Sequence, residues 1–196
     1  MGKILVAYTT NAGSTGKVAE TIGKELTQSG LQVEVRRLEE IVSLDGYTGV
    51  VVGAPMILGW HRAAVKFVKQ NQQALSRLPV AYFMTAMSLT CLPGESAGDI
   101  PLCIDPELAK PPKNSKRRSF KERYASLSNY LSPALKAGPA VKPISVAFFG
   151  GKLEIPRLKL WQMIFVLLVI QPQTGDFRNW PFIKEWAGNL ARQFTN

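Results

Sequence analysis

A run of hydroxyl-bearing and small residues near the start of the chain has the composition of a phosphate-binding loop. The run reads Thr9-Thr10-Asn11-Ala12-Gly13-Ser14-Thr15. It lies between a continuously apolar stretch, 3–8, and a segment from about Thr15 whose apolar residues recur at helical spacing. A helix beginning there would offer free backbone N–H groups and the positive end of its dipole. Hydroxyl side chains would add further donors, so the loop could bind a phosphate without a lysine.

Two common nucleotide-binding loops do not fit this run. A Walker loop needs glycine where Asn11 stands and a hydroxyl where Val18 stands. A dinucleotide-binding loop needs three glycines, and here only Gly13 and Gly16 are present. An ordinary strand-to-helix turn remains the alternative, because Ser and Thr favour such turns. We expect phosphate binding, since a simple turn needs fewer small and hydroxyl-bearing residues than this run contains.

Composition predicts one globular domain, 1–196, because 196 residues with 46% hydrophobic content can form one well-buried core but hardly two. No basic and apolar leader precedes the first predicted strand, so we expect a cytoplasmic protein. Cys91, Cys103 and His61 are the only cysteines and histidine. They are too few for a disulfide framework and badly spaced for a metal site, so we expect no bound metal.

The net charge of +10 indicates an anionic partner, and the basic residues are concentrated between Lys110 and Arg123. Glu122 is the only acidic residue in that segment. A solvated basic loop is the simpler reading. We do not expect nucleic acid as the partner, because only Phe120 and Tyr124 are interleaved with the positive charges.

Strand-like and helix-like segments alternate along the chain. The predicted strands are 3–8, 31–35, 49–53, 78–85 and 143–151, and the predicted helices are about 15–29, 63–75, 124–137 and 180–194. Alternation of this kind requires right-handed crossovers between parallel strands. We therefore predict an α/β fold with a doubly wound, five-stranded parallel sheet and helices on both faces.

Two insertions interrupt this pattern. The first, at about 86–119, contains five prolines and is predicted to be a long loop. The second, at about 152–179, contains the apolar run Trp161–Ile170. As a helix this run would be about 15 Å long, half the thickness of a bilayer core, and could not cross a membrane. It is either buried in the protein or partly sunk into a membrane surface beside Arg157 and Lys159.

With a hydroxyl-rich loop after the first strand and loops after strands three and four, the chain resembles the flavodoxins. That resemblance implies the flavodoxin-like fold and an FMN cofactor whose phosphate is bound by the run from Thr9 to Thr15. It further implies that the loop after strand three lies on one face of the isoalloxazine ring, with Trp60 as the stacking aromatic. The residues of this loop are Pro55, Met56, Ile57, Leu58, Gly59 and Trp60. The other side of the ring would be bordered by Thr85, Ala86, Met87 and Ser88.

Among flavodoxin-like proteins, the chain is most similar to the quinone-linked protoporphyrinogen oxidases. The similarity is an ordered series after strand five: Gly150-Gly151, Pro156-Arg157, Trp161–Ile170, Thr174-Gly175-Asp176-Phe177 and Trp186. The segment Gly59-Trp60-His61-Arg62-Ala63-Ala64 adds to it. The resemblance implies an oxidoreductase that removes hydride equivalents from protoporphyrinogen IX or a similar anionic, apolar substrate and passes electrons to a quinone.

Several further roles are expected on this basis. The chain would lie at the inner face of a membrane through Trp161–Ile170 and Lys110–Arg123. His61, beside the proposed ring site, would assist proton transfer, unless it is an ordinary structural histidine. Two other functions remain open: a one-electron carrier that docks to redox partners, and an interaction module that keeps the fold without flavin.

Overall fold

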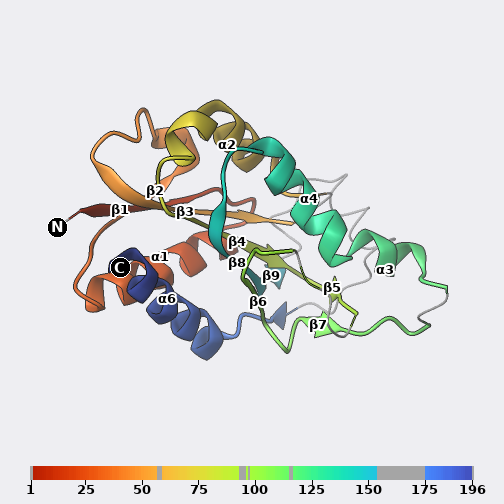
Figure 1. The fold of residues 1–196 in the computed structure, drawn as a ribbon. Coiled ribbons are helices and arrows are strands. Elements are labelled where there is room, and N and C mark those ends of the chain that lie inside the picture. The colour runs from red at the N-terminus through yellow and green to blue at the C-terminus, as the bar shows by residue number, and fades with distance from the viewer. Residues whose placement is uncertain are drawn as a thin grey trace.

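A six-stranded parallel sheet forms the centre of the molecule (Figure 1). The computed structural model describes residues 2–56, 59–92, 96, 98–114, 117–153 and 175–195. The strand order is β2-β1-β3-β4-β8-β6, and every pair in this sheet is parallel. The strands are β1 (Lys3–Tyr8), β2 (Gln32–Arg37), β3 (Tyr47–Pro55), β4 (Val80–Ala86), β6 (Leu102–Ile104) and β8 (Pro143–Gly150).

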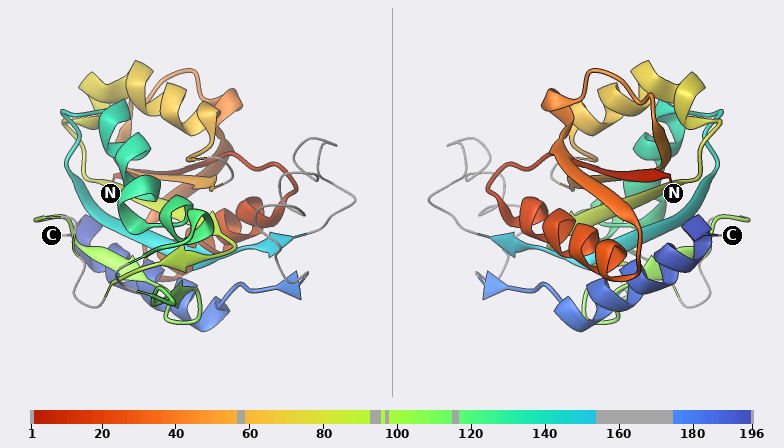
Figure 2. Two further views of the ribbon diagram at one scale, coloured as in Figure 1. Left: turned by 90° about the vertical axis from the view of Figure 1, so that its right-hand side faces the viewer. Right: turned by 90° about the vertical axis from the view of Figure 1, so that its left-hand side faces the viewer.

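Helices cover both faces of the sheet (Figure 2). Helices α2 (Arg62–Leu75) and α4 (Leu127–Ala137) pack on one face, and α1 (Ser14–Gln28) and α6 (Trp180–Thr195) pack on the other. Each face of the sheet has its own hydrophobic core, and successive residues of β4 point into the two cores in turn. Tyr82 packs on the side of α2 and α4, and Phe83 packs on the side of α1 and α6. This burial on both faces explains the continuously apolar strands and confirms the doubly wound prediction.

The sixth strand corrects the sequence-based prediction of five strands. It lies inside the segment predicted to be a loop, 86–119, where β6 pairs with β8 at the edge of the sheet. The same segment contains a small parallel pair, β5 (Leu89–Thr90) and β7 (Ala109–Lys110). Strands of two or three residues between prolines are too short to show a periodic pattern. Their positions are fixed by pairing with distant strands, which local sequence does not report.

The remaining elements are short. They are a 3₁₀ helix η1 (Leu38–Glu40), helix α3 (Phe120–Tyr124), and the antiparallel strands β9 (Lys152–Leu153) and β10 (Gly175–Asp176). The predicted helix from Tyr124 onward is divided, because the Ser126 hydroxyl accepts a hydrogen bond from Asn129 N–H at 3.4 Å and starts α4 anew. The apolar run Trp161–Ile170, expected to be either buried or partly sunk into a membrane surface, lies outside the described residues. No helix in the described part of the chain is long and apolar enough to cross a bilayer.

The two insertions meet at a buried aspartate. Asp105, directly after β6, is fully buried, and its Oδ1 accepts hydrogen bonds from Glu107 N–H at 3.0 Å and from Asn179 Nδ2 at 3.1 Å. Asn179 in turn accepts a bond from Phe182 N–H at 3.2 Å at the start of α6. One carboxylate therefore ties the edge strand from the first insertion to the beginning of the last helix.

Candidate functional site

The hydroxyl-rich loop lies between the carboxyl end of β1 and the start of α1. Gly13 precedes the first helical residue in the left-handed conformation, with φ of 87°. In the described structure no side chain caps this helix, so the first-turn N–H groups of α1 are open to the loop. The Thr10 hydroxyl accepts a hydrogen bond from Gly13 N–H at 2.9 Å. The loop thus presents backbone donors and the positive end of a helix dipole, the arrangement that binds anions.

Buried contacts join this loop to the ends of β3 and β4. Thr15 and Thr85 are 0% and 4% exposed, and their hydroxyls share a hydrogen bond of 2.9 Å. The carbonyl of Thr85 accepts a bond from Met56 N–H at 2.8 Å, immediately after Pro55 at the end of β3. The structure therefore brings together three loops that the sequence predicted to share one site. They lie where parallel α/β sheets bind ligands, beyond the carboxyl ends of central strands.

Thr9 differs from the other hydroxyls of the loop. It is buried, its N–H donates to Gly53 carbonyl at 3.0 Å, and its hydroxyl donates to Glu39 Oε1 at 3.1 Å. The hydroxyl is therefore used to hold η1 against the loop. The sequence did not indicate a carboxylate beside the hydroxyl-rich loop, since Glu39 belongs to η1, which follows β2.

His61 is placed beside the loop by its role as the N-cap of α2. Its Nδ1 accepts a hydrogen bond from Ala63 N–H at 3.2 Å, and Nε2 lies 3.2 Å from Asn11 Oδ1. Because Nδ1 accepts, the neutral ring carries its proton on Nε2 and donates it to Asn11. Burial lowers the pKa of His61, and the charge of Glu39 opposes that shift. The structure therefore favours a neutral ring that links two loops.

Trp60 is not placed as the sequence suggested. Its side chain is 3% exposed, belongs to the core under α2, and lies 5.3 Å from the Tyr82 ring centroid with a tilt of 54°. A tight bridge between Met56 and Trp60 turns the indole inward, with Gly59 at a φ of 99°. The structure thus offers no exposed indole face for stacking on a ring. Ile57 and Leu58, also predicted at this site, lie outside the described residues.

The segment after β4 is fixed from two sides. Gly151 N–H donates to the Ala86 carbonyl at 2.8 Å, and a Cβ on Gly151 would come within 3.5 Å of the Met87 sulfur. On the other side Ser88 forms a hydrogen bond with the Tyr130 hydroxyl, whose pKa is raised mainly by burial. Tyr130 was missed by sequence reasoning, because it belongs to α4, beyond the first insertion.

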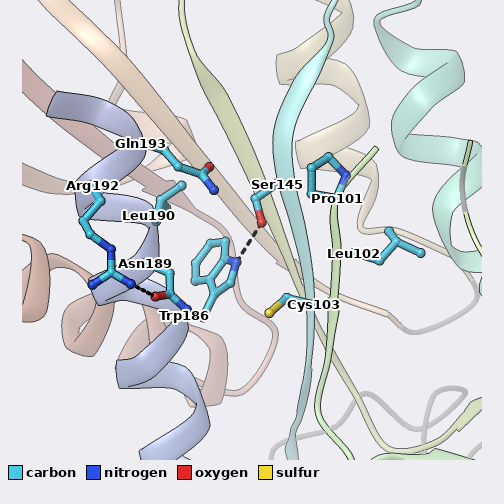
Figure 3. Close-up of a pocket in the computed structure, with 9 residues that line it drawn as sticks. All are labelled: Pro101, Leu102, Cys103, Ser145, Trp186, Asn189, Leu190, Arg192 and Gln193. Carbon is cyan, nitrogen blue, oxygen red and sulfur yellow. Dashed lines mark hydrogen bonds between the residues drawn. The ribbon is translucent and has the colours of Figure 1, made fainter. Parts of the chain in front are cut away.

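A separate cavity lies near the amino end of β8, away from the loops that follow β1, β3 and β4. It measures about 360 Å³ and is lined by residues of α6, of the edge strand β6 and of its neighbour β8 (Figure 3). The Trp186 indole N–H donates to the Ser145 hydroxyl at 2.9 Å in its wall. Cys103 also lines it, and burial together with the charge of Glu185 raises the pKa of this thiol, which makes it a poor nucleophile. Ser145 lies near the amino end of β8, so the cavity is distinct from the loops described above.

No group of His, Cys, Asp and Glu residues in the described part of the chain could hold a metal ion. Cys91 and Cys103 form no disulfide in the part of the chain that the structure describes.

The topology and the loop after β1 define a flavodoxin-type protein. The flavodoxin domain family model matches residues 5–179, so the chain belongs to that family, and the resemblance found in the sequence is confirmed. Family membership implies a flavin cofactor.

Curated relatives match along nearly the whole chain. Protoporphyrinogen IX dehydrogenase [quinone] of Escherichia coli strain K12 is 24% identical over 201 aligned residues, covering 99% of this chain and 95% of the relative. The protein of the same name from Leishmania major is 23% identical, covering 96% of this chain and 74% of the relative.

Solved structures agree on the fold. An archaeal flavodoxin superposes with a TM-score of 0.52 and 12% identity, covering 99% of both chains. Reduced Megasphaera elsdenii flavodoxin gives a TM-score of 0.52 and 13% identity, covering 96% of this chain and 98% of the flavodoxin. At such identities these structures support the fold alone.

Proposed function

We propose that the protein is an FMN-dependent dehydrogenase that oxidises protoporphyrinogen IX, or a similar anionic and apolar porphyrinogen, with a quinone as electron acceptor. The observation that carries the proposal is the start of α1 after Gly13, where no side chain caps the helix and where Thr15 bonds to Thr85 at the end of β4. The curated relatives that match along most of this chain are named protoporphyrinogen IX dehydrogenase [quinone].

The loop residues fit the phosphate of FMN. The Thr10 hydroxyl occupies the acceptor position over Gly13 N–H, which a phosphate oxygen would take when the cofactor binds. Ser14, the first residue of α1, is half-buried and adjacent to that position. Asn11 and Ala12 complete the turn, and the buried Thr15–Thr85 bond fixes the distance between the phosphate and the ring segment.

Residues after β3 and β4 would border the flavin ring. Pro55, at the end of β3, and Met56 would lie on one side, and Thr85 and Ala86, at the end of β4, with Met87 and Ser88 would lie on the other. Bound FMN supplies hydride acceptance and stepwise electron release. The protein contributes fixed backbone positions: the Ala86 carbonyl is held by Gly151, and Ser88 is held by Tyr130. His61, neutral and bonded to Asn11, is better suited to positioning the phosphate loop than to donating protons.

The first test is the purified protein itself. A visible absorption spectrum would reveal bound flavin, and a flavin-loaded sample should oxidise protoporphyrinogen when a menaquinone or ubiquinone is present. Turnover with neither quinone would contradict the dehydrogenase proposal. If the loaded protein instead exchanges single electrons with a flavodoxin reductase in a salt-sensitive manner, the carrier function is correct.

A substitution at the phosphate loop tests the cofactor directly. Ser14→Ala should weaken FMN binding about tenfold or more, because a hydrogen bond to a charged group is lost, and should leave riboflavin binding unchanged, because riboflavin has no phosphate. Thr21→Ala on the same helix is the matched control, since its hydroxyl donates to the Lys17 carbonyl at 2.9 Å, one turn further along α1 than the loop. Equal losses for FMN and riboflavin would contradict a phosphate role for Ser14.

A further inference from the structure

The geometry points to a docking surface for an anionic lipid bilayer on α3 and the residues before it. We call this the α3 surface and define it by Lys113, Arg117, Phe120, Lys121 and Arg123. Figure 1 places α3 at the end of the molecule where β5 continues from the carboxyl end of β4. The docking is independent of catalysis. Its use, to bring a lipid-soluble acceptor to the candidate site, rests on the proposed function.

The α3 surface combines positive charge with an exposed aromatic ring. All four of its cationic residues are exposed, and Phe120 is 63% exposed, one of the few large apolar side chains so placed in the described part of the chain. Cations attract anionic headgroups, and an aromatic ring among them can enter the boundary between headgroups and acyl chains.

The only acidic residue in this segment is already engaged. Glu122 accepts hydrogen bonds from Lys113 N–H at 2.7 Å and from Ser119 N–H at 2.7 Å, and its carboxylate also accepts the Ser119 hydroxyl at 2.8 Å. These bonds, led by the one from Lys113, lower the pKa of Glu122 to about 2. The carboxylate thus connects the backbone at Lys113 with the backbone at Ser119, directly before α3, so Lys113 and the cations of α3 belong to one hydrogen-bonded arrangement.

A chain of aromatic contacts leads from this surface to the candidate site. Phe120 stacks on Tyr124 with ring centroids 6.4 Å apart and a tilt of 19°, and Tyr124 meets the buried Tyr130 edge-on at 6.4 Å. Tyr130 holds Ser88, which borders the proposed flavin ring. The backbone adds a second link, since Thr90 N–H donates to the Ala125 carbonyl at 2.7 Å. The surface is therefore braced directly against the segment after β4.

A bilayer fits these features better than an acidic protein does. Helix α3 has five residues and offers no groove or extended face for a specific protein partner. Clustered charge around a protruding ring needs only a planar anionic surface with an apolar interior. A quinone acceptor would be dissolved in the same bilayer.

The test is binding of the full-length, flavin-loaded protein to vesicles. The wild type should bind vesicles that contain phosphatidylglycerol, should release them as salt is raised, and should bind weakly to pure phosphatidylcholine. Reversing two charges with Arg117→Glu and Lys121→Glu should weaken binding to the anionic vesicles at least about 25-fold, because each cation near such a surface contributes about fivefold. Phe120→Ser should weaken binding about tenfold and reduce penetration of the lipid.

Lys66→Glu with Lys69→Glu on α2 is the matched control, since it makes the same change in net charge at exposed positions away from α3. It should weaken vesicle binding much less than the Arg117 and Lys121 pair. If both pairs of substitutions weakened vesicle binding equally, net charge alone would explain the binding, and the proposal would be wrong. Failure of the wild type to bind anionic vesicles would also overturn it, whether or not turnover is observed, and capture of an acidic protein by the α3 surface without vesicle binding would favour the protein partner.

Discussion

At the scale of single residues, His61 links two parts of the candidate site while capping a helix. Its two ring nitrogens face the backbone of α2 and the side chain of Asn11. Protonation of Nδ1 would remove the acceptor that caps α2. The sequence could indicate His61 only as a residue near the site. Its N-cap position follows from where α2 begins, and its bond to Asn11 follows from the packing of two loops distant in sequence.

His61 should therefore titrate below the ordinary histidine pKa of about 6.5, because burial lowers its pKa. As the only histidine, it gives a single imidazole signal whose pH titration can be followed by NMR. The unfolded chain takes up this proton near pH 6.5, whereas the folded protein does so at lower pH. Stability from this residue is thus complete above pH 6.5 and is lost as pH falls through the folded pKa.

His61→Asn provides the comparison, because Asn also caps helices but does not titrate. The difference in melting temperature between wild type and variant should shift in favour of the variant as pH falls below 6.5. A folded pKa above 6.5 would contradict the neutral, helix-capping role.

Single residues also mark where sequence reasoning failed at the site. The hydroxyl run could be predicted, because strand, loop and helix are contiguous there. The stacking role of Trp60 could not be judged from sequence, since an indole after a strand can turn either way. Here Trp60 forms a β-bridge with Met56, and its indole packs against Tyr82.

At the scale of elements, the start of α1 depends on the left-handed conformation of Gly13. Gly13→Ala should destabilise the protein by about 1–2 kcal/mol, because an L side chain is strained at this φ. Gly188→Ala is the opposite case. Gly188 lies inside α6 with no atom within 4 Å of an added Cβ, so alanine there should stabilise by about 0.5–1 kcal/mol.

Thermal or urea unfolding measures both substitutions, and opposite signs are expected. Equal effects would mean that the turn at Gly13 can relax into a conformation open to alanine. In the FMN complex the Gly13→Ala cost should be accompanied by weaker cofactor binding, whereas Gly188→Ala should leave binding unchanged.

The elements with long apolar patterns could be predicted from sequence almost to their ends. Strand β1 agrees residue for residue with the predicted range 3–8, and α2 and α6 differ by one residue at an end. The strands within the first insertion could not be predicted from sequence. β5, β6 and β7 have two or three residues each, and their formation depends on pairing with other segments.

At the scale of the whole molecule, Asp105 holds the two insertions together. Asp105→Ala removes two hydrogen bonds to a buried carboxylate and should reduce the free energy of unfolding by about 2–3 kcal/mol. Asp105→Asn keeps an acceptor for Glu107 N–H and Asn179, so its loss should be smaller. Urea denaturation of the two variants measures the difference, and equal losses would show that keeping an acceptor for Glu107 N–H and Asn179 contributes nothing.

The position of β6 bears on how the chain avoids aggregation while it is being made. Strand β8 contains Val146-Ala147-Phe148-Phe149, and without β6 its backbone would form the exposed edge of the sheet. Long, uncharged apolar edges recruit strands from other molecules. Because β6 precedes β8 in the chain, β6 leaves the ribosome before β8 does. β6 can therefore pair with the edge of β8 as soon as β8 emerges.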